Sequence, residues 1–296
     1  MNSLYVAGMY GLGDNVFSRP FVHAATKRWE VWLDTPWPEI YEDLNIKFVR
    51  GQPRRLRTQN KNINRQPRER WSLPPSGTAR QIKIGYGADL QAWSIIHSME
   101  TQWANVGIGF DPSLFNLPDM GAAPFVSNRP IAVVRPVTVR SEWRNEARNP
   151  LPEYLTIIIR HLMVTHTVVM VADLEPGQEW LVGKLPPAHQ YFVNGELSVR
   201  QLLALVRDAD VVVGPVGWIV PVGLALKVKT FVVLGGHGGH NAPHKITDKR
   251  LDLSRLGFAT PDRFCQCTGM LHNCKKEMAD PLGQFCRWWA NFQVAV

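Results

Sequence analysis

The chain has 296 residues, of which 45% are hydrophobic and 20% charged, and this composition excludes a disordered chain and a coiled coil. Its length allows two domains of ordinary size or one large α/β domain. The formal net charge is +8 at pH 7, and residues 51–83 carry nine Lys or Arg against one acid, Glu69. The remaining residues balance, so the whole positive excess lies in this one basic segment.

The sequence predicts a soluble protein of a reducing compartment. Its first residues, MNSLYVAGMYGLGDN, lack the basic start and the cleavage site of a signal peptide. The longest apolar run, Val211 to Leu226, is broken by glycines and prolines and is too short for a membrane-spanning helix. Four cysteines in a chain without a secretory signal are typical of the cytoplasm.

In the first part of the chain, short apolar runs alternate with helical patterns. Strands are predicted at residues 4–8, 29–33, 46–49 and 81–86, and helices at residues 16–28 and 89–104. This alternation predicts a parallel sheet with helices on its faces. Residues 50–77 interrupt it with Asn, Gln, Arg and Pro and no apolar period, which predicts a long, mobile loop.

A proline-rich stretch follows at residues 111–130, and its end is interpreted as the linker to a second α/β unit. Strands are predicted there at residues 131–134, 167–171, 211–213 and 230–234, and helices at residues 152–163, 218–226 and 282–292, with one more after Ser198 as N-cap. The fold class is therefore α/β, with two Rossmann-like domains facing a cleft. We expect the first domain at residues 1–128 and the second at residues 129–280, followed by a C-terminal helix in residues 281–296.

Three loops follow predicted strands, where the ligands of parallel α/β sheets usually bind. The first, Gly11-Leu12-Gly13-Asp14, would place a carboxylate in the cleft, where it could accept a proton from a hydroxyl. A tight turn that ends in an N-capping Asp is the structural alternative. The second loop offers four polar or basic side chains to a phosphate: Thr138, Arg140, Arg144 and Arg148. Neighbouring glutamates could instead pair with these arginines.

The third loop consists of two glycine-rich turns, VVVGPVGW and VVLGGHGGH, each after a buried strand. Glycine lets a ligand approach the backbone, and a helix N-terminus attracts phosphate. Trp218 could stack on a base or a sugar, or pack in a helix interface.

The order and spacing of these motifs resemble the ADP-heptose:lipopolysaccharide heptosyltransferase family of GT-B glycosyltransferases. The resemblance covers roughly the first 30 residues and residues 131–236. In that family a GD motif, followed by a helix and a proline, supplies the catalytic base, which implies this role for Asp14, with Pro20 in the helix. The Thr-Thr-Arg-type loop that binds the donor diphosphate looks like Thr138-Val139-Arg140 here, with Arg140 or Arg144 in place of the usual following Lys.

The resemblance implies an inverting, metal-independent transfer from a nucleotide sugar, and a C-terminal helix that packs back toward the first domain. Where the family carries Asp-Thr-Gly, this chain has Val216-Gly217-Trp218, so a carboxyl contact to the donor is missing, which argues against ADP-heptose itself but not against a nucleotide-sugar donor. The expected donor is a UDP- or ADP-linked sugar. The predicted donor contacts are Gly13, Thr138, Arg140, Arg144, Gly214, Gly217, Trp218, Gly235, Gly236 and His237.

The acceptor is expected on the first domain, which contains the basic segment. Its predicted contacts are Arg54, Arg55, Arg57, Arg65, Arg68, Arg70 and Trp71, a set that suits a polyanion. We favour a hydroxymethylated base in phage DNA, which would place the enzyme in a bacterial or phage-infected cytoplasm. The alternatives are a lipopolysaccharide-core acceptor and a non-enzymatic nucleic-acid-binding protein.

Four cysteines have the spacing C-x-C-x6-C-x11-C. Together with the nearby His272, Cys265, Cys267 and Cys274 could hold a structural zinc ion. The paired CxxC knuckles that mark zinc sites are missing, so reduced cysteines without a ligand are favoured, and a disulfide is a further alternative.

Overall fold

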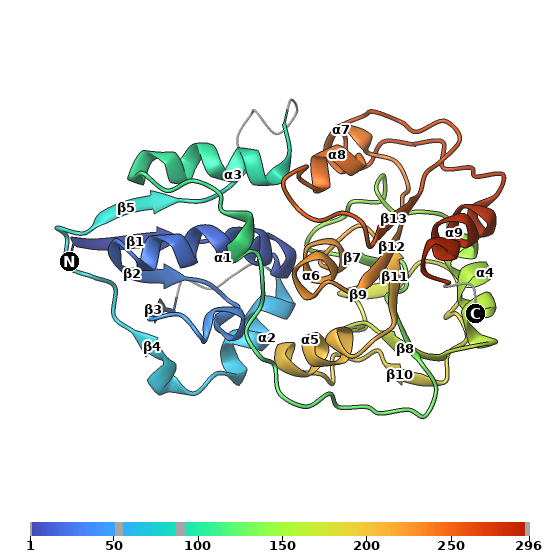
Figure 1. Cartoon of the computed structure of the whole chain (residues 1–296), viewed down its shortest axis with the longest axis horizontal. Coiled ribbons are helices and arrows are strands. Elements are labelled where there is room, and N and C mark those ends of the chain that lie inside the picture. The colour runs from blue at the N-terminus through green and yellow to red at the C-terminus, as the bar shows by residue number, and fades with distance from the viewer. Residues whose placement is uncertain (1, 51–55, 87–92, 294–296) are drawn as a thin grey trace.

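Two parallel sheets form the framework of the protein (Figure 1). The computed structural model describes residues 2–50, 56–86 and 93–293. The first sheet has the strand order β4-β3-β2-β1-β5. Its strands are β1 (Asn2–Ala7), β2 (Trp29–Asp34), β3 (Ile46–Val49), β4 (Trp71–Ser72) and β5 (Arg80–Lys83). The helices of this half are α1 (Leu12–Thr26), α2 (Arg57–Arg65) and α3 (Ile95–Trp103), with short 3-10 turns η1 (Pro38–Tyr41), η2 (Arg68–Arg70), η4 (Ala104–Val106) and η5 (Pro112–Leu114).

The second sheet has the order β10-β8-β6-β11-β12-β13. Its strands are β6 (Ile131–Val134), β8 (Thr167–Val171), β10 (Gln190–Phe192), β11 (Val211–Pro215), β12 (Lys229–Val233) and β13 (Leu256–Ala259). A separate antiparallel pair joins β7 (Thr138–Arg140) to β9 (Glu179–Leu181). The helices are α4 (Pro152–Met163), α5 (Val199–Arg207), α6 (Ile219–Leu226), α7 (Gly238–Asn241), α8 (Pro243–Ile246) and α9 (Pro281–Trp289), followed by η6 (Ala290–Phe292).

Buried apolar strands at the centre of each sheet explain why the parallel α/β pattern was readable from the sequence. Every residue of β6 and of β11 is buried, as expected for strands covered by helices on both faces. The predicted fold class of two parallel α/β units is confirmed. Helix α4 has the predicted bounds, and Ser198 caps α5 through a capping box with Gln201.

The two halves touch through α1 and α6. A Cβ atom added to Gly13 in α1 would lie 3.2 Å from the Cα of Trp218 and 3.2 Å from the Cγ of Pro221. One apolar cluster continues through both halves, with Phe17 on one side and Val216 and Val220 on the other. The first turn of α1 therefore lies directly against the start of α6.

The basic segment does not form the loop that the sequence predicted, because residues 57–65 fold into α2. The buried face of this helix consists of Gln59, Asn62 and Ile63, spaced as on one side of a helix. The Gln59 amide donates to the Tyr10 carbonyl at 2.9 Å, and the Asn62 amide donates to the Pro36 carbonyl at 2.7 Å. Since two of the three buried positions are amides that find hydrogen-bond partners, no apolar period marks the helix.

Two further expectations are corrected. Helix α1 begins at Leu12 rather than at Val16, so Gly13 and Asp14 belong to its first turn. Helix α9 packs on α4 and β13 of the second half, and not toward the first half as the resemblance implied (Figure 1). Its aromatic side chains explain this position, because Phe285 and Trp288 both contact Phe231 of β12.

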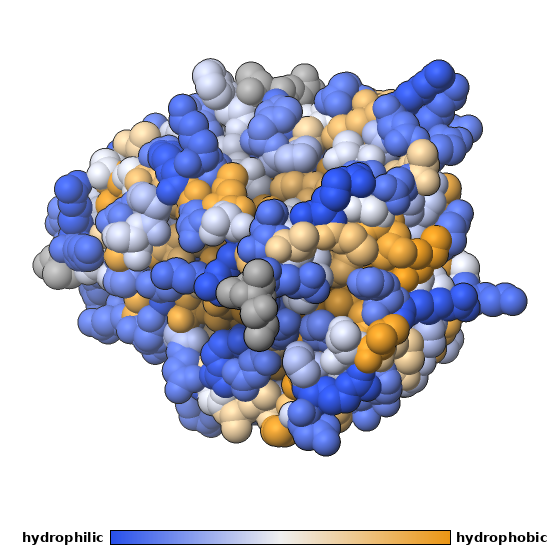
Figure 2. Space-filling view, turned by 45° about the vertical axis from the view of Figure 1, so that its right-hand side comes forward, coloured by the Kyte–Doolittle hydropathy of each residue, from blue (hydrophilic) through white to orange (hydrophobic). Residues whose placement is uncertain are grey.

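Hydrophilic residues cover most of the face seen in Figure 2, with apolar side chains visible between them. Among the described residues, no helix combines the length and the apolar character needed to cross a membrane.

Candidate functional site

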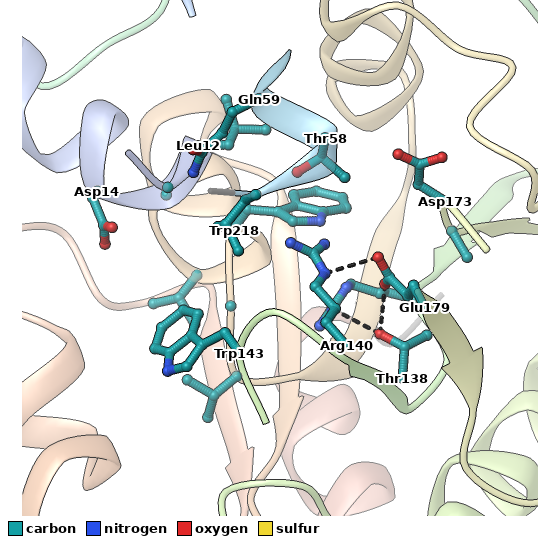
Figure 3. A pocket seen from close by; sticks show the side chains of 18 of the residues that line it. Leu12, Asp14, Thr58, Gln59, Thr138, Arg140, Trp143, Asp173, Glu179 and Trp218 are labelled. Carbon is teal, nitrogen blue, oxygen red and sulfur yellow. Dashed lines mark hydrogen bonds and ion pairs between the residues drawn. The ribbon is translucent and has the colours of Figure 1, made fainter. Parts of the chain in front are cut away.

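A cavity of about 570 Å³ lies between the two halves. Its lining comes from the start of α1, from α2, from β7 and the segment after it, and from the residues around the starts of α6 and α7 (Figure 3). This volume falls within the range of small-molecule sites. Two of the three loops identified in the sequence, and part of the third, therefore meet at one cavity.

Asp14 faces the cavity from a tightly fixed turn. The extended N-cap residue Gly11 has no room for a side chain, because a Cβ atom there would lie 2.5 Å from a carboxylate oxygen of Asp14. The buried amide of Asn15 holds the turn by donating to the carbonyls of Met9 at 2.7 Å and Gly11 at 2.8 Å. The glycine and the asparagine thus hold the turn after β1 in place, and with it the carboxylate beside the cavity.

The surroundings of Asp14 favour proton acceptance. Burial raises the pKa of Asp14 above its usual value, while a hydrogen bond donated by the Tyr86 hydroxyl, the Gly11 backbone and the charge of Arg148 lower it in part. The carboxylate is a stronger base than a solvated one, and it keeps its place through the Tyr86 contact.

On the opposite side, β7 and β9 form a polar cluster. Arg140 pairs with Glu179 at 2.8 Å, and the Thr138 hydroxyl donates to the other oxygen of Glu179 at 2.8 Å (Figure 3). Glu179 is buried, so its charge needs these partners. No local sequence pattern marks Glu179 as a site residue, because it pairs with Thr138 and Arg140 across about forty positions.

Apart from the exposed Arg65, two cavity-lining arginines lack an acidic ion-pair partner within the described chain: the buried Arg135 and the half-buried Arg148. Burial lowers the pKa of each to about 10, which still leaves both charged at pH 7. The Nε of Arg148 is buried without a hydrogen-bond partner, and its guanidinium lies 5.1 Å from the centre of the Trp143 ring. Buried or half-buried cations without counter-charges suit an anionic ligand.

His237 organises the second glycine-rich turn. Its ring Nδ1 lies 3.2 Å from the Asn145 amide and 3.0 Å from the Asn241 amide, and its Nε2 lies 3.0 Å from the Thr268 carbonyl. Because both amides donate, Nδ1 accepts and Nε2 carries the proton. Burial lowers the pKa of His237, consistent with a neutral ring. Of the predicted donor contacts, the cavity lining contains Gly13, Thr138, Arg140, Gly217, Trp218 and His237.

The other predicted donor contacts lie outside the lining. Arg144 is exposed and pairs with Glu146. The remaining three are glycines that allow close packing. A Cβ atom at Gly214 would lie 3.0 Å from the Arg135 carbonyl, at Gly235 it would lie 2.3 Å from the Asn149 carbonyl, and at Gly236 it would overlap Cys274. For these glycines, packing within the second half accounts for the motif.

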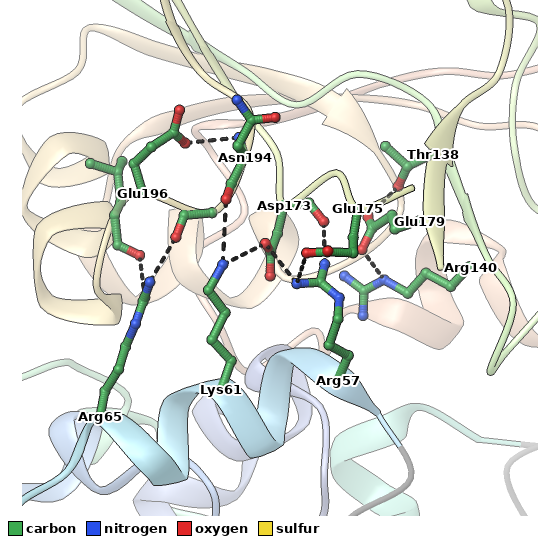
Figure 4. A network of polar contacts seen from close by, with 12 residues as sticks. Arg57, Lys61, Arg65, Thr138, Arg140, Asp173, Glu175, Glu179, Asn194 and Glu196 are labelled. Carbon is green, nitrogen blue, oxygen red and sulfur yellow. Dashed lines mark hydrogen bonds and ion pairs between the residues drawn. The ribbon is translucent and has the colours of Figure 1, made fainter. Parts of the chain in front are cut away.

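Helix α2 uses its basic side chains to hold the second half (Figure 4). Arg57 and Lys61 pair with Asp173 at 3.2 and 3.0 Å. Arg65 donates to the carbonyls of Gly195 at 2.9 Å and Leu197 at 3.2 Å. These partners follow β8 and β10, more than 100 positions away, and much of the positive charge is therefore engaged within the molecule.

Among the predicted acceptor contacts that the structure describes, only Arg65 lines the cavity. Arg70 pairs with Glu42, whereas Arg68 is exposed and has no ion pair in the parts of the chain that the structure describes. Trp71 is half-buried in β4. The predictions for Arg54 and Arg55 fall outside the described residues.

Three of the four cysteines come together with a histidine. The ligand atoms of Cys265, Cys267, His272 and Cys274 all lie within 4.8 Å of one another. Cys286 lies elsewhere, with its Sγ 4.0 Å from His161. The sequence named these three cysteines and His272 as a possible zinc site while favouring reduced cysteines without a ligand, and the structure brings the four side chains together.

The structure is similar to several solved glycosyltransferases. It matches the iron-containing dodecameric glycosyltransferase TibC of enterotoxigenic E. coli with a TM-score of 0.65 and 12% identity, over 99% of this chain and 77% of that chain. E. coli ADP-heptose lipopolysaccharide heptosyltransferase II gives 0.59 and 12% identity, over 99% and 100% of the two chains. A glycosyl transferase family 9 protein of Veillonella parvula gives 0.53 and 10%, over 87% and 85%. No protein-family model and no curated protein matches the sequence.

At these identities the likeness shows the fold. The chain has the GT-B arrangement of two α/β halves around a cleft, as the resemblance of its motifs implied.

Proposed function

We propose that this protein is an inverting glycosyltransferase that uses a nucleoside-diphosphate sugar as its donor. The main observation behind the proposal is that a carboxylate and two cations face the same cavity. Asp14, a carboxylate with a raised pKa, lines it together with the buried Arg135 and the half-buried Arg148, two cations without acidic ion-pair partners in the described chain. The fold supports the proposal, because similar structures include an E. coli enzyme named for ADP-heptose.

In the proposed reaction, Asp14 accepts the proton of an acceptor hydroxyl while that oxygen attacks the anomeric carbon. The bond to the donor diphosphate breaks on the opposite face of the sugar, which inverts the anomeric centre. Arg148 and Arg135 neutralise the negative charge that develops on the departing diphosphate. Arg140 contributes through the N–H groups that its Glu179 pair leaves available. We expect no catalytic metal, since these cations take over charge neutralisation.

A nucleotide panel tests the donor class. Thermal unfolding of the full chain is followed with UDP, ADP, GDP and CMP, and we expect a raised Tm with UDP or ADP, because a ligand that binds only the folded state stabilises it. A non-enzymatic nucleic-acid-binding protein would show no nucleotide-dependent shift, and that outcome would overturn the proposal. Transfer should need no added Mg²⁺ or Mn²⁺, and EDTA added during the assay, without prior stripping of the protein, should leave it intact.

For the acceptor, we retain two candidates: a hydroxymethylated base in phage DNA and a sugar of a lipopolysaccharide core. The net excess of eight positive charges in residues 51–83 supports a polyanion. The engagement of Arg57, Lys61 and Arg65 with the second half leaves fewer charges for it, which favours the lipopolysaccharide-type acceptor more than the sequence alone did.

Fluorescence anisotropy with duplex and single-stranded oligonucleotides distinguishes the two. If about four to six Lys or Arg side chains contact duplex phosphates, raising the salt from 50 to 200 mM should weaken binding by roughly two to three decades. The exposed, unpaired Arg68 is the described position to change first, and Arg68→Ser should reduce the salt slope by about one. Weak binding without a salt slope would leave the lipopolysaccharide-type acceptor.

A further inference from the structure

We propose that Cys265, Cys267, His272 and Cys274 bind one thiophilic metal ion, Zn²⁺ or Fe²⁺. This ion would stabilise the loop that supports the arginine-bearing side of the cavity. The site is separate from the transfer chemistry. Nothing in the proposed reaction requires it, and its ligands belong to a segment of the second half that contains no helix or strand.

The separations of the ligand atoms fit a tetrahedral site. Sulfur atoms about 2.3 Å and a nitrogen about 2.0 Å from a central ion lie roughly 3.8 Å (S–S) and 3.6 Å (S–N) apart. Here Cys267 Sγ is 3.4 Å from Cys274 Sγ, and His272 Nδ1 is 3.3 Å from Cys274 Sγ and 3.6 Å from Cys265 Sγ. Three thiolates and one imidazole in this arrangement select zinc or iron rather than magnesium or calcium.

The segment that contains the four ligands has no regular secondary structure to hold its conformation. Residues 260–280 connect β13 to α9 without any helix or strand, and a connection of this length is uncommon in a compact domain. Among the described residues, its two ends are joined by two hydrogen bonds, from the Asp262 N–H to the Glu277 carbonyl at 3.0 Å and from the Ala279 N–H to the Asp262 carboxylate at 2.9 Å. A four-ligand ion would close the loop from residue 265 to residue 274 and supply the cohesion that an apolar core gives elsewhere.

The glycine-rich turn at α7 packs on this segment. The Gly238 N–H donates to the Cys265 carbonyl at 2.7 Å, and the Gly239 N–H donates to the Cys267 carbonyl at 3.1 Å. A side chain at Gly236 would overlap Cys274, whose Sγ lies 2.3 Å from the Cβ position. The glycines at 236, 238 and 239 thus let the backbone lie directly on the ligand loop.

From there the contacts reach the cavity. The Thr268 carbonyl fixes the ring of His237, which holds Asn145. The Met270 carbonyl accepts from the Ala147 N–H at 2.9 Å, and the Met270 sulfur accepts from the Trp143 indole at 3.1 Å. The first bond holds the residue that precedes Arg148, and the second holds Trp143, whose ring lies against the Arg148 guanidinium. All four coordination positions are filled by side chains, so the ion has a structural and not a catalytic role.

Metal analysis of the purified full chain tests the site without any nucleotide, so its outcome is independent of the proposed function. The protein is prepared under reducing conditions without chelator, and elemental mass spectrometry should find about one zinc or iron ion per chain. His272→Ala and Cys267→Ser should each lower metal affinity by more than the roughly 10- to 100-fold lost when a hydrogen-bonded neighbour of a ligand is changed. Cys286→Ser is the matched control and should keep the full content.

Wild-type protein stripped by a chelator provides a second measurement that does not depend on variant folding. We expect its Tm to fall and to recover when Zn²⁺ or Fe²⁺ is added. Absence of metal from the reduced protein, together with no uptake of either ion, would overturn the proposal. Equal metal content in Cys267→Ser, Cys286→Ser and wild type would overturn it as well.

Discussion

Asp14 and Arg148 face the same cavity from walls that are built in different ways. Asp14 belongs to the first turn of α1, where Gly11 and Asn15 fix the backbone. Arg148 belongs to an irregular segment between β7 and α4, which is held by contacts with a second irregular segment, residues 260–280. The comparison teaches that the turn with the proposed base is held by residues next to it in sequence, whereas the segment with the proposed anion-binding arginine depends on a distant part of the chain.

The largest expected effect is on the local side. Asp14→Asn keeps the size of the side chain and removes proton acceptance, so transfer should slow by roughly 10²- to 10⁴-fold. Binding of a nucleoside diphosphate should change little, as measured by calorimetry. Near-full activity of the purified variant would remove Asp14 from its role.

The second effect probes the anion-binding side. Arg148→Ala should weaken nucleoside-diphosphate binding by about 1.5–3 kcal/mol, the worth of hydrogen bonds to a charged group. Arg140→Ala should weaken it less, since Glu179 already takes part of that guanidinium. Arg144→Ala is the matched control, because Arg144 pairs with Glu146 outside the cavity and should leave affinity unchanged. If only Arg144→Ala weakens binding in calorimetry, the diphosphate lies on the outer face of this loop.

A third effect concerns the contact between the halves. A double-mutant cycle on Arg57 and Asp173 should give a coupling of about 1 kcal/mol in the free energy of unfolding, since both side chains are mostly buried. The exposed pair of Lys47 and Glu30 serves as the comparison and should couple more weakly. Denaturant titrations at low and high salt measure both, and equal couplings would show that α2 is not specifically held by this pair.

The smallest effect sharpens the electrostatics of Asp14. The Tyr86 hydroxyl lowers the pKa of Asp14, so Tyr86→Phe should raise it further. Because the ionised carboxylate accepts the proton, activity is lost as pH falls through this pKa, and the acidic limb of the rate profile should move to higher pH. A limb that moves to lower pH would contradict the assignment.

The sequence alone determined the features that depend on short-range pattern. Continuous apolar runs placed β6, β8 and β11, because strands buried on both faces of a parallel sheet consist mainly of apolar residues. The Ser198 cap and the proline at the start of α4 marked two helices. Gly11 to Asp14 follow the first strand directly, so their position at the cavity was also readable.

The tertiary structure alone decided the rest. Helix α2 was missed because it buries amides whose partners lie elsewhere in the fold, and its basic side chains bind Asp173 and Gly195 more than 100 positions away. Glu179 joins Arg140 in the same way. The spacing of the cysteines and His272 allowed a metal site, but the path of an irregular loop decides that their side chains meet. A local pattern records the period of a helix or strand, but the partner of a buried charge or a metal ligand is set by how distant segments meet.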